Sequence, residues 1–167
     1  MGLVSRFSIA MFWRSLLDTN LSEFANQLQN GMALHKAGKL LEAEQAYLSI
    51  PPAAPEHIDA LHLRGVVALQ KGNAAQAIEL IQQAIQIRND VPAMHSNIAE
   101  AYRAMGRNGD AIAHARTALK LQPDYHACRA NLALALAADR QLEEAEKELR
   151  KVIEVEPRNA LAWNNLG

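Results

Sequence analysis

The side chains that most often carry out chemistry are few in this sequence, and they form no recognised catalytic or metal-binding pattern. Histidines occur at positions 35, 57, 62, 95, 114 and 126, without an HExxH motif or the paired spacing of a metal site. We interpret His95 and His114 as helix-packing or surface residues. The sequence therefore predicts no catalytic residue, no metal site and no cofactor.

The only cysteine, Cys128, excludes an internal disulfide and a zinc site built from paired cysteines. No histidine or acidic partner is predicted for it, so we expect a buried, inert thiol rather than a nucleophile. A free cysteine fits a reducing compartment, and we expect a cytoplasmic protein.

One glycine-rich run, from Gly106 to Asp110, could be mistaken for a phosphate-binding or calcium-binding loop. It lacks the remaining residues of either motif. We interpret Gly106 to Gly109 as a turn between two helices.

Composition favours an all-α protein without electrostatic attraction to nucleic acid. Apolar residues make up 50% of the 167 residues but aromatic residues only 5%, and alanine and leucine dominate the apolar share. The 17 Lys and Arg residues are balanced by 18 Asp and Glu residues. The resulting net charge of -1 gives no reason to expect nucleic acid or an anionic membrane as partner.

The dominant feature of the chain is a repeat with a period of 34 residues. Small residues recur at this spacing in two columns: Ala43, Ala77, Ala111 and Ala145, and Gly31, Gly65, Ala99, Ala133 and Gly167. A glycine column, Gly38, Gly72 and Gly106, is interrupted by Arg140. The predicted units are residues 24–57, 58–91, 92–125 and 126–159, followed by the start of a fifth at 160–167.

Each unit is expected to form a hairpin of two helices. In the third unit, helical spacing runs from Met94 to Met105 and resumes from Ala111 to Leu121, and Pro123 prevents continuation. The small columns have a mechanical reason, because two antiparallel helices can approach closely only where their side chains are small.

Residues 1–20 predict a short amphipathic helix. Its apolar face would consist of Ile9, Phe12, Trp13, Leu16 and Leu17. The stretch between Arg6 and Arg14 is far shorter than the roughly 20 apolar residues of a membrane span. We expect this helix to cap the first repeat, with contact to a membrane surface or a partner as the alternative.

The repeat resembles the tetratricopeptide repeat family over residues 24–167. The segment Ala162-Trp163-Asn164-Asn165-Leu166-Gly167 is close to the start of that family's consensus. The resemblance implies a right-handed α-solenoid whose first helices line a concave groove. It implies a non-catalytic interaction scaffold that binds an extended peptide or a partner protein there.

The resemblance also indicates which side chains face the groove. They include Leu28, Met32, His35, Lys36, His62, Leu63, Gln70 and Arg103. Asn97, Asn131 and Asn165 repeat at the same spacing and resemble the asparagine ladder of O-linked N-acetylglucosaminyltransferases, which holds acceptor polypeptides. An asparagine amide can pair with both the N–H and the C=O of a peptide backbone. The alternative is that asparagine is simply common at this place in the repeat.

Chaperone-binding members of the family hold a C-terminal carboxylate with Lys, Asn and Arg side chains. Here Leu28 and Met32 stand at the first two of those places, and Ala93 and Asn97 stand at the last two. We therefore do not expect an adaptor for chaperone tails.

A second hypothesis is that the chain is the N-terminal substrate-recognition arm of a longer enzyme. Residues 61–70 and 97–106 resemble the repeat arms of bacterial glycosyltransferases of the O-linked N-acetylglucosaminyl type and of related sulfotransferases. Any catalytic domain would then lie beyond residue 167, since the residues shown predict no enzyme activity.

Overall fold

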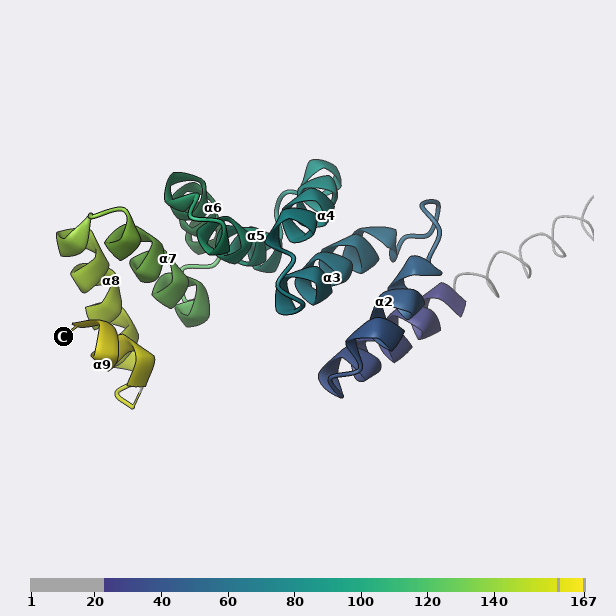
Figure 1. Cartoon of the computed structure of the whole chain (residues 1–167), viewed down its shortest axis with the longest axis horizontal. Helices are drawn as coiled ribbons and strands as arrows, with labels where there is room; N and C mark the ends of the chain where they lie inside the picture. The colour runs from purple at the N-terminus through teal and green to yellow at the C-terminus, as the bar shows by residue number, and fades with distance from the viewer. Residues whose placement is uncertain (1–22, 159, 167) are drawn as a thin grey trace, which may run out of the picture.

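The computed structural model describes residues 23–158 and 160–166, and this part of the chain is helical throughout, with turns but no strand. The predicted helix in residues 1–20 lies outside the described residues. Figure 1 shows the helices following one another in a single curved row of hairpins. The predicted all-α solenoid is confirmed.

The helices pair in the order of the sequence. Residues 23–36 form a hairpin with α2 (Leu40–Leu48), α3 (His57–Gln70) pairs with α4 (Ala74–Ile87), and α5 (Pro92–Ala104) pairs with α6 (Asn108–Leu121). Next, α7 (His126–Ala138) pairs with α8 (Leu142–Val155), and α9 (Ala160–Leu166) contacts α8.

Successive hairpins stack so that the first helices form one layer. Each second helix contacts the first helix of the next hairpin, as α4 does with α5 and α6 with α7. In addition, α3 contacts α5 and α5 contacts α7. We call the layer formed by residues 23–36, α3, α5 and α7 the inner layer.

In the first two hairpins, a glycine on the first helix lies opposite a larger residue on the second. A Cβ atom built on Gly31 would lie 2.5 Å from Tyr47 Cε1, and one built on Gly65 would lie 2.4 Å from Ile81 Cγ1. All four alanines of the column Ala43, Ala77, Ala111 and Ala145 are buried, with at most 3% exposed. The helices are therefore in contact along positions that tolerate no added volume.

The turn inside each hairpin has the same backbone geometry in all four cases. Gly38, Gly72, Gly106 and Arg140 have φ angles of 74°, 79°, 71° and 64°. In each turn, the next residue donates its N–H to the carbonyl five residues earlier, as Arg107 does to Tyr102 at 2.9 Å. This pattern is the Schellman motif, whose left-handed residue is usually glycine. Arg140 adopts the same conformation at the cost of contacts around its Cβ.

The third hairpin differs in detail from the sequence prediction. Helix α5 begins at Pro92 rather than Met94, and α6 begins at Asn108 rather than Ala111. Proline is suited to the first helical position because its missing N–H would have no partner there. The turn closes at Gly106 and Arg107, so Asn108 and Gly109 belong to the first turn of α6, not to the loop.

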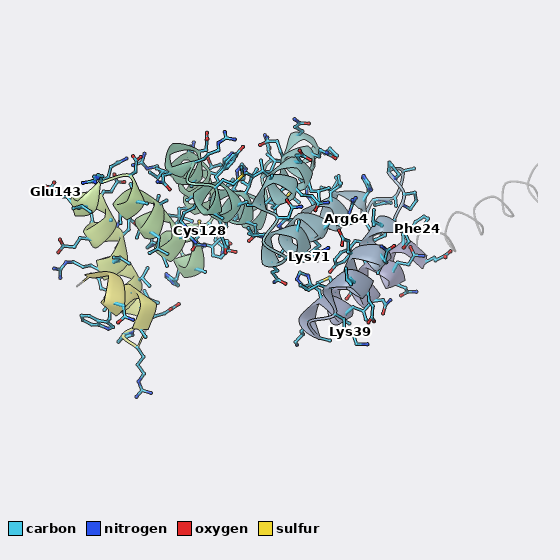
Figure 2. All side chains as sticks on the ribbon, viewed as in Figure 1. Phe24, Lys39, Arg64, Lys71, Cys128 and Glu143 are labelled. Atoms are coloured by element: carbon cyan, nitrogen blue, oxygen red, sulfur yellow. The ribbon has the colours of Figure 1, made fainter. Side chains whose placement is uncertain are left out.

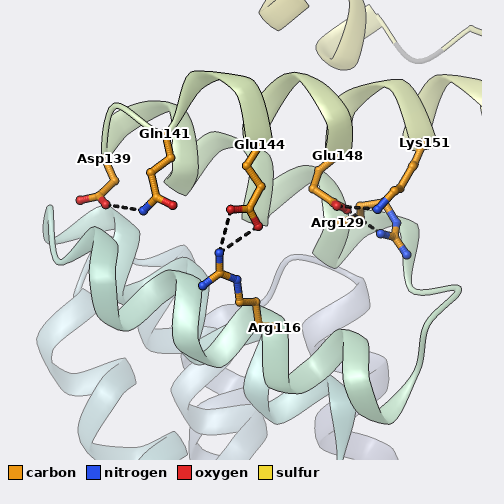
Figure 3. Close-up of polar contacts among 7 residues, drawn as sticks. All are labelled: Arg116, Arg129, Asp139, Gln141, Glu144, Glu148 and Lys151. Carbon is orange, nitrogen blue, oxygen red and sulfur yellow. Dashed lines mark hydrogen bonds and ion pairs between the residues drawn. The ribbon is translucent and has the colours of Figure 1, made fainter.

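Ion pairs connect α6 with α8 and α7 with α8 (Figure 3). Arg116 of α6 donates to both oxygens of Glu144 in α8, at 2.8 and 2.9 Å, but both side chains are exposed and such a pair is worth about 1 kcal/mol at most. Glu148 is buried and accepts from Arg129 at 2.5 Å and Lys151 at 2.6 Å. Burial raises the pKa of Glu148, but Lys151 and Arg129 outweigh it and hold the pKa below its usual value.

Adding one methyl group at Gly65 tests the close packing of the hairpin. We expect Gly65→Ala to lower the free energy of unfolding by about 1 to 2 kcal/mol, because overpacking against Ile81 outweighs the gain in helix propensity. The control is Gly109→Ala, whose added Cβ would meet no atom within 4 Å and which should be neutral or stabilising by up to about 1 kcal/mol. Equal effects of the two substitutions in urea denaturation would contradict this packing.

Arg140→Gly tests the strain in the fourth turn. We expect the free energy of unfolding to rise by about 0.5 to 1 kcal/mol, because glycine adopts positive φ without the steric cost of a Cβ atom. The mirror-image control, Gly72→Ala, should lower the free energy of unfolding by a similar amount. If Arg140→Gly is instead less stable than the parent in thermal and urea unfolding, the contacts of the arginine side chain contribute more to stability than the strain in its backbone costs.

Candidate functional site

Two side-chain hydrogen bonds connect adjacent helices of the inner layer. The amide nitrogen of Asn97 in α5 lies 2.8 Å from Nε2 of His62 in α3. His35, in the helix of residues 23–36, lies 3.0 Å through Nε2 from Oε1 of Gln70 in α3. Both pairs are separated by 35 residues, one more than the repeat period.

This 35-residue register follows from the stacking of one inner helix on the next. The same offset relates Leu28 to Leu63, and both side chains pack against the apolar cluster around Ala43 and Tyr47. Of these three sets of residues 35 apart, one therefore consists of apolar side chains and the other two consist of hydrogen-bonded polar side chains.

Burial determines the charge of His62. Its side chain is only 9% exposed, and this burial lowers its pKa to about 4. Asp59 opposes the shift, but it is paired with Arg88, which adds to the lowering. His62 is therefore neutral near pH 7, and its Nε2 can accept the hydrogen bond that the amide of Asn97 donates.

The remaining predicted groove residues are placed less tightly. Asn131 occupies in α7 the place that Asn97 has in α5, and it is half-buried. Arg103 lies in the last turn of α5, half-buried, with its Nε buried and unpaired. Among the described residues the structure thus brings His62 and Asn97 together, but it joins neither Asn131 nor Arg103 to them. The side chain of Asn165 lies outside the described part of the chain.

His95 and His114 pack against each other, a contact that the sequence did not predict, although packing between helices was one of the two roles expected for them. Their rings stack with centroids 5.3 Å apart and their Nδ1 atoms are 3.1 Å apart. The ring of Tyr102 also stacks on His114, with centroids 5.5 Å apart. His95 also contacts the carbonyl of Asn89 through Nε2 at 2.9 Å. Burial, and then the neighbouring His95, lowers the pKa of His114. Across residues 23–158 and 160–166, no three His, Cys, Asp or Glu side chains are grouped to hold a metal ion.

Cys128 has the surroundings of a structural thiol. It is fully buried at the junction of α6 and α7 (Figure 2), and its Sγ lies 3.6 Å from the carbonyl oxygen of Ala115. Burial raises its pKa above the usual value. A thiol that stays protonated is a poor nucleophile, so this site does not support catalysis by Cys128.

None of the described helices is both long enough and apolar enough to cross a membrane.

The chain is similar in fold to repeat regions of solved structures. It aligns with the first TPR of Spaghetti (RPAP3) bound to HSP90 peptide SRMEEVD, with a TM-score of 0.63 and 27% identity, over 65% of this chain and 86% of that one. It also aligns with a Thermobaculum terrenum O-GlcNAc transferase, with a TM-score of 0.71 and 23% identity, over 80% of this chain and 26% of that one.

Sequence comparison gives the same family. The chain is 30% identical, over 106 residues, to the small glutamine-rich tetratricopeptide repeat-containing protein 2 of Mycosarcoma maydis; this covers 64% of the chain but only 30% of that relative's length. The family model described as tetratricopeptide repeat matches residues 68–113 and 103–166. With more than half of its residues matched and with the stacked hairpins described above, the chain belongs to the tetratricopeptide repeat family.

Proposed function

We propose that this protein is an interaction scaffold that binds an extended peptide, or an extended segment of a partner protein, along its inner layer. The peptide would run across α3, α5 and α7 and pair mainly through its backbone. The binding residues proposed are His62, Asn97 and Arg103, with Asn131 and Asn165 one and two repeats further along.

The observation that carries this proposal is the hydrogen bond between His62 and Asn97. A neutral His62 accepts a hydrogen bond from the amide N–H of Asn97, which fixes the rotation of the asparagine side chain. The second amide proton and the oxygen of Asn97 remain available, and together they can pair with a backbone C=O and N–H. A side chain that is already ordered loses less conformational entropy when a ligand binds.

Arg103 and Asn131 extend the polar surface on either side of Asn97. Arg103 has no ion-pair partner among the described residues, so its guanidinium can donate hydrogen bonds to a backbone carbonyl or to an acidic group of a ligand. Asn131 has no side-chain hydrogen bond within the described residues, which leaves its whole amide for a ligand. Few charges line this surface, which suits backbone recognition with weak dependence on peptide sequence.

The repeat domain of RPAP3 supports the choice of ligand, since it was solved with a bound peptide. The mode of binding proposed here differs in one respect from the capture of a C-terminal carboxylate. Leu28 and Met32 cannot donate the hydrogen bonds that such a terminus requires. The proposed ligand is therefore an internal segment.

A second candidate is that the groove recognises the substrate of a longer enzyme. The observation that favours it is the match to a region amounting to 26% of an O-GlcNAc transferase chain. The gene sequence downstream of codon 167 decides between the two: a nucleotide-sugar domain would favour the enzyme arm, and further repeats would favour the scaffold.

Replacing the two described asparagines tests the proposed groove. We expect Asn97→Ala with Asn131→Ala to weaken binding of many selected peptides by about 10-fold to 100-fold, because each lost hydrogen bond costs about 0.5 to 1.5 kcal/mol. The matched control is Gln83→Ala with Gln86→Ala, two exposed amides on α4. Equal affinities of parent and asparagine variant in fluorescence-anisotropy titrations would refute the asparagine ladder.

A pH series tests the neutral state of His62. Its folded-state pKa of about 4 lies below the ordinary value of 6.5, so the unfolded chain binds the proton more readily. Stability from this group is complete above pH 6.5 and is lost as the pH falls towards 4. We expect His62→Gln, which keeps an acceptor for Asn97, to reduce this acid destabilisation by about 1 to 3 kcal/mol. Identical pH dependence of urea unfolding in parent and variant would contradict a neutral, buried His62.

A further inference from the structure

A depression opens on the inner layer between the helix of residues 23–36 and α3. Its volume is about 430 Å³, and it is lined by Met32, His35, Lys36, Tyr47, Leu63 and Gln70. Five of these residues come from the two inner helices, whereas Tyr47 comes from α2 behind them. We call this depression the Tyr47 pocket.

Tyr47 reaches the pocket because Gly31 has no side chain. The tyrosine ring passes where a Cβ atom of residue 31 would lie, 2.5 Å from Cε1 and 3.1 Å from Cζ. The whole residue is only 1% exposed, and its hydroxyl is buried without a hydrogen-bond partner among the described residues. A buried hydroxyl is normally paired, so this one is an unused donor on a residue that lines the pocket.

Lys36 brings a positive charge to the edge of the pocket. Lys36 is exposed and forms no ion pair with any described residue. His35 lies edge-on to Tyr47, with ring centroids 6.4 Å apart, and is held by Gln70. No carboxylate among the described residues lines the pocket. The nearest acidic side chain along α2, Glu44, is already paired at 2.8 Å with Lys71, which is labelled in Figure 2.

We propose that the Tyr47 pocket binds an acidic side chain, glutamate or aspartate, of the peptide that occupies the groove. The carboxylate would accept hydrogen bonds from the Tyr47 hydroxyl and the Lys36 ammonium group, and Met32 and Leu63 would pack against its aliphatic stem. A hydrogen bond between an ammonium group and a carboxylate is stronger than one between a neutral donor and a neutral acceptor. This inference rests on the proposed function, and it adds a sequence preference to backbone recognition.

The chemistry of the tyrosine agrees with this role. Burial raises the pKa of Tyr47 to about 12, so its hydroxyl keeps its proton and can donate at any physiological pH. The pocket includes Met32, which stands at one of the places where chaperone-binding relatives would hold a terminal carboxylate, but Met32 has no hydrogen-bond donor, so the donors proposed here are Tyr47 and Lys36 instead.

A displayed library of random ten-residue peptides, fused through their C-termini, is selected on the full chain. Peptides that bind are then synthesised as C-terminal amides, so that a carboxylate can come only from a side chain. Each is compared with its Glu→Gln or Asp→Asn counterpart. Affinities are measured by fluorescence anisotropy for the parent, Tyr47→Phe, Lys36→Gln and the control Lys120→Gln, an exposed lysine on α6.

We expect enrichment of acidic residues and a loss of affinity of about tenfold for Tyr47→Phe, for Lys36→Gln and for the amide counterparts of the peptides. Tyr47→Phe should remain at least as stable as the parent, because it removes an unpaired buried hydroxyl, and Lys120→Gln should bind normally. Selected peptides without acidic residues, or equal binding to the parent and to Tyr47→Phe, would overturn the proposed pocket. If the double asparagine variant still binds these peptides weakly, the proposed groove would stand. Selection of no peptide at all would overturn both proposals.

Discussion

The structure depends on how closely two helices approach each other within a hairpin. That distance is set where a glycine or alanine of the first helix faces the second helix, as Gly65 faces Ile81. The alanines at positions 43, 77, 111 and 145 leave the same narrow space in every hairpin. Because the spacing within each hairpin is fixed, hairpins of equal thickness stack in one register, and a curved row results (Figure 1).

The inner layer follows from that stacking. Inner helices of neighbouring hairpins contact each other, so side chains 35 residues apart meet across the junction. Leu28 and Leu63 are apolar residues related in this way, whereas His35 with Gln70 and His62 with Asn97 are hydrogen-bonded pairs. The inner layer is therefore ordered and still has hydrogen-bonding capacity. The same narrow space at Gly31 lets Tyr47 cross from the outer helix to the inner face. Packing and the proposed binding surface thus have one structural origin.

Much of the fold could be predicted from the sequence, because a 34-residue column of small residues has few physical explanations. Helix ends were harder to predict: Asn108 and Gly109 favour turns by composition, yet they occupy the first turn of α6. The contact between His62 and Asn97 was not predictable, although each residue was a candidate, because it depends on the rotation of one hairpin against the next. The Tyr47 hydroxyl was missed for a related reason. A tyrosine in a second helix predicts core packing, and only the structure shows that its ring passes Gly31.

The central claim is that a peptide lies along the inner layer, and a spin-labelled peptide would test it most directly. Paramagnetic relaxation enhancement would be measured on the backbone amides of the chain, with a selected peptide carrying a nitroxide near its middle. The account predicts the strongest broadening in residues 23–36, α3, α5 and α7, centred near His62 and Asn97. Broadening concentrated on α4, α6 and α8 instead would contradict it.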